Sequence, residues 1–262
     1  MKHCNAHLDT VREQFAVQAE HFGDAPMAMG NEAYQAWSLA QIPLSARDLV
    51  LDVAAGTCLI TQKLAQRARA VVALDATPEM LQKGVQQARE QGIDNLLPVV
   101  GEAEHLPFLD GTFDLVVSRL LLHHVVDVDA VLAEMARVCR PGGTVAVIDL
   151  VCVAPKEDEA YYNALERLRD PSHTRALYRE ELRDACQRAG LVCVGESLKQ
   201  VEAHLTAWMA LTHTSAQHRE TIRQALLAER AGGRATGFAP YGEPDALCFT
   251  QNWAMVVCQK RA

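Results

Sequence analysis

Apolar positions near the start of the chain follow helical spacing. Apolar residues recur every three to four positions, at Val11, Phe15, Ala19 and Phe22, and would form one face of a helix. The stretch from Gly23 to Gly30 interrupts this pattern. A second helix is predicted over 31–40, ahead of Pro43.

From residue 48 onward, short apolar runs alternate with helical segments. The runs predict strands at 49–53, 70–75, 96–100, 113–118 and 144–151. The helix after the second strand has the clearest boundaries, with Thr77 as its N-cap, Pro78 at its first position and Gly92 at its end. Strands that alternate with helices predict an α/β fold, in which a doubly wound parallel sheet is covered on both faces.

The pattern loosens after residue 150. Helices are predicted over 157–167 and 179–189, a strand over 191–194, a mostly helical region over 201–231 and a last strand over 249–259. We therefore expect a mostly parallel, seven-stranded sheet with a helical cap insertion, in a single domain spanning residues 1–262. Its parts would be a helical lid (1–44), a core (45–151), and the remaining sheet elements with the cap (152–262, the cap at about 202–245).

Composition agrees with a folded globular protein, because 49% of the residues are hydrophobic and 22% are charged. The net charge of −8 argues against a nucleic-acid partner, since binding phosphates requires Lys and Arg. No apolar run approaches the length of a membrane span, and the first residues do not look like an export signal, so we expect a cytoplasmic protein. The eight cysteines show no metal-ligand spacing, which predicts reduced thiols and no metal.

Candidate chemistry lies after the first two predicted strands. Open parallel sheets bind ligands beyond the carboxyl ends of their strands. Residues 52–58 (Asp-Val-Ala-Ala-Gly-Thr-Cys) form the first such turn, where Gly56 would let a ligand approach the backbone. Asp75 ends the second strand, about 20 residues later, where a carboxylate can accept hydrogen bonds from ribose hydroxyls. The alternative is that Gly56 serves only a tight turn and Asp75 only its own loop.

Three further motifs follow in order: residues 101–108 (Gly-Glu-Ala-Glu-His-Leu-Pro-Phe), 113–119 (Phe-Asp-Leu-Val-Val-Ser-Arg) and 140–143 (Arg-Pro-Gly-Gly). With these motifs, residues 45–150 resemble the class I S-adenosylmethionine-dependent methyltransferases, in particular the group that includes the ubiquinone and menaquinone C-methyltransferases. The resemblance implies a Rossmann-like methyltransferase fold, S-adenosylmethionine as cofactor and a small-molecule acceptor. Residues 45–151 would then be the cofactor-binding core.

The resemblance also assigns cofactor contacts. Ala54 and Gly56 would lie against the methionine part, with Asp52 in the same turn. The first and third glycines of the family's turn are Ala54 and Cys58 here, which narrows the turn. The remaining implied contacts are Asp75 with the ribose, Ala76 and Met80 with the adenine, Glu102 and Ala103 with the adenine edge, and the backbone of Ser118 with the amino group.

Methyl transfer from a sulfonium needs alignment and exclusion of water, and it needs a base only if the acceptor must lose a proton. Histidine suits that role because its pKa lies near neutrality. His124 follows the fourth strand at the expected cleft, and His173 lies in a polar turn that would border the acceptor. These are the two candidate catalytic residues, and the alternative is that both only pack in loops.

The acceptor would be enclosed by the lid, by the region around residue 170 and by the cap. An insertion of mixed aromatic and apolar residues suits a small, partly apolar acceptor. The candidate acceptor-binding residues are Phe22, Tyr161, Tyr162, Arg169, His173, Arg175, Trp208, Phe238 and Tyr241.

Two other functions stay open. A nicotinamide-dependent oxidoreductase could use the same ribose acid, but the turn lacks the G-x-G-x-x-G spacing that such enzymes use to bind a pyrophosphate. A non-catalytic, cofactor-binding protein of the same fold would fit the two replaced glycines. The sequence names neither the acceptor nor the methylated atom, and the protein could be a monomer or a homodimer.

Overall fold

The computed structural model describes residues 2–20, 22 and 30–261, and the side chains of residues 6–20, 22 and 30–261. The predicted break between Gly23 and Gly30 therefore lies almost wholly outside the described residues. The helices and strands, in chain order, are α1 (Lys2–Gln18), α2 (Glu32–Ala40), β1 (Leu49–Val53), α3 (Leu59–Ala65), β2 (Ala70–Asp75), α4 (Pro78–Glu90), β3 (Leu96–Val100), β4 (Phe113–Arg119), η2 (Leu122–His124), α5 (Val128–Val138), β5 (Cys139–Val151), η3 (Lys156–Asp158), α6 (Glu159–Arg169), α7 (Arg179–Arg188), β6 (Leu191–His204), α8 (Leu205–Leu211), α9 (Ala216–Arg230) and β7 (Cys248–Lys260).

The strands form one seven-stranded sheet in the order β3-β2-β1-β4-β5-β7-β6. β1 to β5 are mutually parallel, whereas β7 runs antiparallel to both β5 and β6. The sheet is thus mixed but mostly parallel, and its order reverses beside β1. That reversal is the point at which open α/β sheets bind their ligands.

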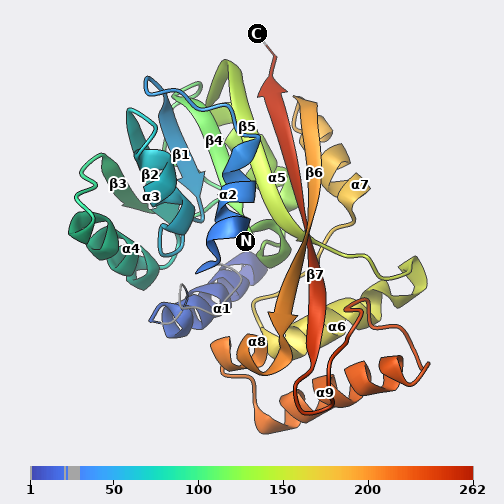
Figure 1. Ribbon diagram of the computed structural model, residues 1–262. Helices are drawn as coiled ribbons and strands as arrows, with labels where there is room; N and C mark the ends of the chain where they lie inside the picture. The colour runs from blue at the N-terminus through green and yellow to red at the C-terminus, as the bar shows by residue number, and fades with distance from the viewer. Residues whose placement is uncertain (1, 21, 23–29, 262) are drawn as a thin grey trace.

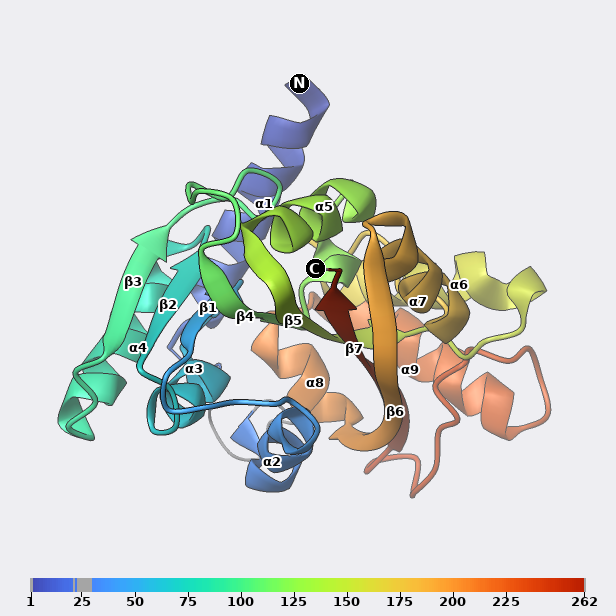
Figure 2. The same ribbon diagram turned by 90° about the horizontal axis from the view of Figure 1, so that it is seen from above.

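Helices cover both faces of the sheet because neighbouring residues of the central strands point to opposite sides. Val71 and Val72 of β2 are both buried, but Val71 packs on the side of α2 and α3, and Val72 on the side of α5 and α7. Figure 2 shows α2 and α3 on one face and α5 and α7 on the other. Because both faces of these strands are covered, their sequences are nearly continuous apolar runs.

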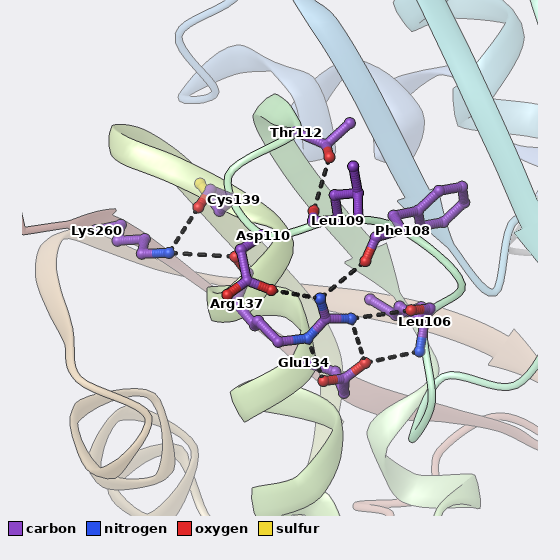
Figure 3. A network of polar contacts seen from close by, with 9 residues as sticks. All are labelled: Leu106, Phe108, Leu109, Asp110, Thr112, Glu134, Arg137, Cys139 and Lys260. Atoms are coloured by element: carbon purple, nitrogen blue, oxygen red, sulfur yellow. Dashed lines mark hydrogen bonds and ion pairs between the residues drawn. The ribbon is translucent and has the colours of Figure 1, made fainter.

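The loop between β3 and β4, which carries Glu102 and Ala103, is fixed to α5 by one arginine. The Arg137 guanidinium donates to the carbonyl oxygens of Leu106 and Phe108, at 2.9 and 2.8 Å, and to the carboxylate of Glu134. Glu134 in turn accepts the backbone N–H of Leu106 at 2.8 Å (Figure 3). This network fixes the second half of the loop, from Leu106 to Asp110, to the C-terminal end of α5.

The second half of the chain differs most from the sequence-based expectation. The sequence predicted a strand that ends at residue 194 and a mostly helical region that starts at 201. Instead, β6 continues to His204, so residues 201–204 are strand, and the helical cap begins at Leu205. β6 and β7 remain paired from Leu191↔Lys260 to His204↔Cys248. In Figure 1 this long hairpin extends below the other strands and carries α8 and α9 at its end.

Two helix ends also differ. α1 ends at Gln18, so Phe22 follows the helix rather than completing its apolar face. Thr77 is the N-cap residue of α4 and Pro78 its first residue, as predicted, but the Thr77 side chain makes no capping hydrogen bond. None of the helices within residues 2–20 and 30–261 has the length and apolar character that crossing a bilayer requires.

Candidate functional site

A cavity of about 330 Å³ lies at the carboxyl ends of β1 and β2. Strand ends supply Asp52 and Asp75 to its wall, and α1 supplies Val11 and Phe15. In Figure 1 the arrowhead of β1 points toward α1, and the cap helices lie at the same end of the molecule. This is the edge where the sequence predicted ligand binding.

The turn after β1 forms despite its replaced glycines. Ala54, Gly56 and Cys58 all have positive φ, at 61°, 55° and 59°. Side chains at such φ values are disfavoured, so this turn stores strain that glycines would not. Space for the Cys58 side chain comes from Gly84 of α4, where a Cβ atom would stand 2.6 Å from the Cys58 sulfur.

Asp75 fixes the shape of that turn. Its Oδ2 accepts the N–H of Gly56 at 2.8 Å, and its Oδ1 accepts the N–H of Thr77 at 2.8 Å. Burial raises the pKa of Asp75, although these backbone donors act to lower it. The carboxylate therefore joins β2 to the loop that follows β1, at the wall of the cavity.

Asp52 is the most deeply buried acid in the cavity wall. Its Oδ2 accepts the Thr61 hydroxyl at 2.5 Å, whereas its Oδ1 has no hydrogen-bond partner among the described residues. Burial raises the pKa of Asp52 to about 7, although the Thr61 hydroxyl and the Arg119 charge act to lower it. A buried acceptor atom without a partner at a cavity wall is a binding site for a donor.

The N-terminal helix contacts the far side of the same cavity. Arg12 donates from Nε to the carbonyl oxygen of Ala76 at 3.1 Å and from Nη2 to Oε1 of Glu102 at 3.2 Å. His7 donates from Nε2 to the carbonyl oxygen of His124 at 2.7 Å. These bonds tie α1 to the loops after β2, β3 and β4.

A second, smaller cavity of about 90 Å³ adjoins the first. Four residues line both: Phe15, Phe22, Leu120 and His124. One wall of the second cavity is aromatic and apolar, and its other wall is polar. The apolar wall includes Leu150, Trp208, Leu211 and Trp253, and the polar wall includes Gln18, His123, Glu166, Arg169, Asp170 and His173.

His124 is held in one tautomer by hydrogen bonds. Its Nδ1 lies 3.2 Å from the carbonyl oxygen of Ser172, which can only accept, so Nδ1 carries the proton. The same Nδ1 lies 3.0 Å from the Ser172 hydroxyl, which donates to Oδ1 of Asp170 at 2.5 Å. Burial, together with the neighbouring His123, lowers the pKa of His124 well below its usual value. The ring is therefore neutral, and Nε2 keeps its lone pair.

The other two histidines of this wall have different partners. His123 Nδ1 lies 2.5 Å from Oδ1 of Asp149; burial acts to lower the pKa of His123, but Asp149 raises it overall. His173 donates from Nε2 to Oδ1 of Asn163 at 2.8 Å, and burial lowers the pKa of His173. No group of three or more His, Cys, Asp or Glu side chains in the described ranges could hold a metal ion.

The chain is similar in sequence to several known proteins. Residues 51–147 match the family described as the methyltransferase domain. The protein YafE of Escherichia coli is 33% identical over 159 residues, which are 61% of this chain and 77% of that protein. The demethylmenaquinone methyltransferase of Thermobifida fusca is 35% identical over 126 residues, 47% of this chain and 52% of that enzyme.

This chain belongs to the methyltransferase family. The fold agrees: the YcgJ protein of Bacillus subtilis superimposes with a TM-score of 0.79 at 24% sequence identity, over 88% of this chain and all of that one. The chain spans more than two thirds of YafE but only about half of the demethylmenaquinone methyltransferase that it matches. The sequence-based resemblance is confirmed at the level of the family.

In this methyltransferase, most residues predicted to contact the cofactor line the first cavity. They are Asp52, Ala54, Gly56, Asp75, Ala76, Met80, Glu102 and Ala103. Ser118 does not line it, and its side chain is fully buried. His124 lines both cavities and His173 lines the second.

The predicted acceptor residues fall into two groups. Phe22, Arg169, His173 and Trp208 line the second cavity. Five others do not line either cavity: Tyr161, Tyr162, Arg175, Phe238 and Tyr241.

Their contacts explain where these five lie. Tyr162 and Phe238 stack at 4.9 Å in the core of the cap, and Phe238 packs behind Trp208. The Tyr161 ring lies under the Arg234 guanidinium at 4.2 Å. The remaining two make ion pairs or hydrogen bonds with acidic groups: Arg175 with Glu159 and Glu181, and Tyr241 with Glu202.

Sequence reasoning did not single out four residues that line the two cavities or contact His124: Gln18, Arg119, Asp170 and Ser172. Gln18 is buried in the wall of the second cavity, where its Nε2 has no hydrogen-bond partner among the described residues. Asp170 and Ser172 were seen only as part of a polar turn around His173. Arg119 stands in the strand motif at 113–119, and a charged residue at the carboxyl end of a mostly apolar strand was a signal that could have marked it.

Proposed function

We propose that this methyltransferase transfers a methyl group from S-adenosylmethionine to a small, partly apolar acceptor whose nucleophilic atom carries a proton. One observation carries the proposal: two cavities adjoin at the carboxyl edge of the sheet, and His124, a neutral histidine, stands in the wall of both. The larger cavity would take the cofactor and the smaller one the acceptor. The methyl group would then cross near the residues that both cavities share.

The larger cavity fits a nucleoside joined to an amino acid. The unpartnered Oδ1 of Asp52 suits an ammonium group, since a buried acceptor gains most from a charged donor. The turn at Ala54 and Gly56 would border the methionine part, with the backbone of Ser118 on the neighbouring strand. Asp75 is the carboxylate for the ribose hydroxyls.

The adenine would lie between the two loops that α1 covers. Ala76 and Met80 offer an apolar surface for a ring, and Glu102 and Ala103 face its edge. Arg12 already contacts Ala76 and Glu102, so α1 would act as a lid over the adenine side. Exclusion of water by such a lid favours transfer over hydrolysis.

The smaller cavity supports a planar or apolar acceptor with one polar group. Trp208 and Phe22 supply apolar surface, and Gln18 supplies a donor for an oxygen of the acceptor. His173 and Arg169 complete the polar side, with Arg169 held against Trp208 by a cation–π contact at 5.0 Å. Phe238, which contacts the Trp208 ring, and Tyr162, which stacks on Phe238, would support this wall.

The bound cofactor supplies an activated methyl group, so the protein must align the acceptor and remove its proton. His124 would accept that proton at Nε2, because its Nδ1 proton is engaged by Ser172. Asp170, hydrogen-bonded to the Ser172 hydroxyl, would stabilise the imidazolium that results. Ser172 and Asp170 are thus positioning residues, and His124 is the catalytic base.

Binding of S-adenosylhomocysteine, measured by calorimetry, tests the cofactor assignment. Wild-type protein should bind it, and Asp75→Asn should weaken binding at least 10-fold by removing an acceptor from the ribose. Asp94→Asn, an exposed carboxylate ahead of β3, is the matched control and should bind normally. No binding to wild type, or equal binding by Asp75→Asn, would contradict the assignment.

A screen of small phenols, enols and amines that reads out S-adenosylhomocysteine release tests the reaction. With an active acceptor, His124→Ala should lower kcat at least 10-fold and leave S-adenosylhomocysteine affinity unchanged. If His124→Ala keeps the wild-type kcat, the enzyme would act only by aligning the acceptor with the methyl group, without a base. Cofactor binding without turnover of any acceptor would favour a non-catalytic binding protein, and recovery of NAD(P) from purified protein would favour the oxidoreductase.

A further inference from the structure

A buried arginine stands where the amino-acid end of the proposed cofactor would lie. Arg119 is the last residue of β4, and Ser118 before it is in register with Val53 of β1. Arg119 therefore ends β4 at the same edge at which Ala54 follows β1. Arg119 is buried, with only 9% of its surface exposed, and it lines the first cavity.

An aromatic ring and a carboxylate lie near this guanidinium. The Trp253 ring lies 5.7 Å from its central carbon, on the side of the second cavity. Asp52 is the carboxylate whose charge acts on Arg119, and Arg119 acts on Asp52 in return. Burial still lowers the pKa of Arg119 to about 10, which leaves the side chain charged at neutral pH.

The other charged groups of the cavity wall are acidic or titratable. Acidic side chains there are Asp52, Asp75, Glu102 and Glu104. Among the described residues that line this cavity, Arg119 is the side chain with a permanent positive charge. A guanidinium has fork geometry that matches a carboxylate, whereas a sulfonium or an ammonium would be repelled by it.

We infer that Arg119 binds the α-carboxylate of the cofactor, while Asp52 binds its α-ammonium group. The two side chains would then recognise an amino-acid zwitterion by opposite charges at the ends of neighbouring strands. Each of the two buried charges gains a direct ligand partner when the cofactor enters. This inference rests on the proposed function, because it assumes that S-adenosylmethionine occupies the first cavity.

Two ligands separate the carboxylate from the rest of the cofactor: S-adenosylhomocysteine and its decarboxylated analogue, S-adenosyl-3-thiopropylamine, which keeps the ammonium group. Calorimetry on the full-length protein should show that wild type prefers S-adenosylhomocysteine by about 10-fold or more. Arg119→Met should reduce this preference to less than about 3-fold. Arg119→Lys, which keeps the charge without the fork, should give an intermediate preference.

Arg230→Met, an exposed arginine at the end of α9, is the control and should keep the wild-type preference. Equal wild-type affinity for the two ligands, or an unchanged preference in Arg119→Met, would overturn the inference. An equal loss of affinity for both ligands would overturn it as well, since that result indicates a structural role. Failure of wild type to bind either ligand would instead reject the proposed cofactor, and this inference with it.

Discussion

The Nδ1 atom of His124 and the Ser172 hydroxyl lie 3.0 Å apart, although 48 residues separate them in the chain. The carbonyl oxygen of Ser172 approaches the same nitrogen, so the proton position on the ring is decided by the backbone of another loop. Such an arrangement leaves a defined lone pair on Nε2. A general base must lie within hydrogen-bond reach of the proton that it abstracts.

This relationship predicts the state of His124 in solution. The ring should remain neutral and protonated at Nδ1 from pH 5 to pH 8, because burial and the neighbouring His123 lower the pKa of His124. Imidazole nitrogen shifts in two-dimensional NMR report both properties, and His124→Gln identifies the resonances. Titration of His124 near pH 6.5, or a ring protonated at Nε2, would contradict the proposed role.

Asp52 should make stability depend on pH. Its folded pKa of about 7 lies above its unfolded value, so the folded state binds more protons over that interval. The free energy of unfolding should therefore fall as pH rises from about 4 to 7. In Asp52→Asn this loss should disappear, a difference of about 2–3 kcal/mol between pH 5 and pH 8.

Urea unfolding of ligand-free protein at several pH values measures this difference. The comparison is a fair one because the side-chain amide introduced by Asp52→Asn keeps a carbonyl oxygen that can accept the Thr61 hydroxyl. Asp94→Asn serves as the exposed control. Parallel stability curves for wild type and Asp52→Asn would show that Asp52 titrates normally in the fold.

The strained turn after β1 predicts an unequal response of two neighbouring alanines to glycine. Ala54 has a φ of 61°, which costs an L-residue about 1–2 kcal/mol, whereas Ala55 does not have a positive φ. Ala54→Gly should therefore leave the unfolding free energy unchanged or raise it by up to about 1 kcal/mol. Ala55→Gly should lower it by about 0.5–1 kcal/mol.

Urea unfolding at one pH compares the two variants, and S-adenosylhomocysteine affinity of Ala54→Gly shows whether the extra Cβ atom hinders binding. Equal losses of stability in both variants would mean that the turn carries no strain at Ala54.

The parallel core could be predicted because β1, β2, β4 and β5 are mostly apolar and are buried over most of their length. β6 could not be predicted in full, because past residue 194 its positions at the edge of the sheet are half-buried or exposed, apart from the buried Val201. Glu196, Lys199, Gln200 and Glu202 give that stretch no apolar run. Its strand conformation comes from pairing with β7, and the local sequence pattern carries no information about that pairing.

The same limit applies to the site. Asp52, Gly56 and Asp75 stand at strand ends that periodicity locates, so the first cavity could be predicted from them. Asp170 and Gln18 reach the second cavity from the loop after α6 and from α1, and no spacing in the chain connects them with His124. Their roles depend on tertiary contacts alone.

The helical cap connects β6 to β7 at the end of the hairpin that these two strands form at one edge of the sheet. The strands that line the first cavity, β1, β2 and β4, lie on the other side of β5. Insertions or deletions between residues 205 and 247 would remodel the wall around Trp208 and leave the register of β1, β2 and β4 intact. Descendants of one ancestral gene could thus differ in the second cavity by altering a single hairpin tip, while inheriting an unaltered first cavity.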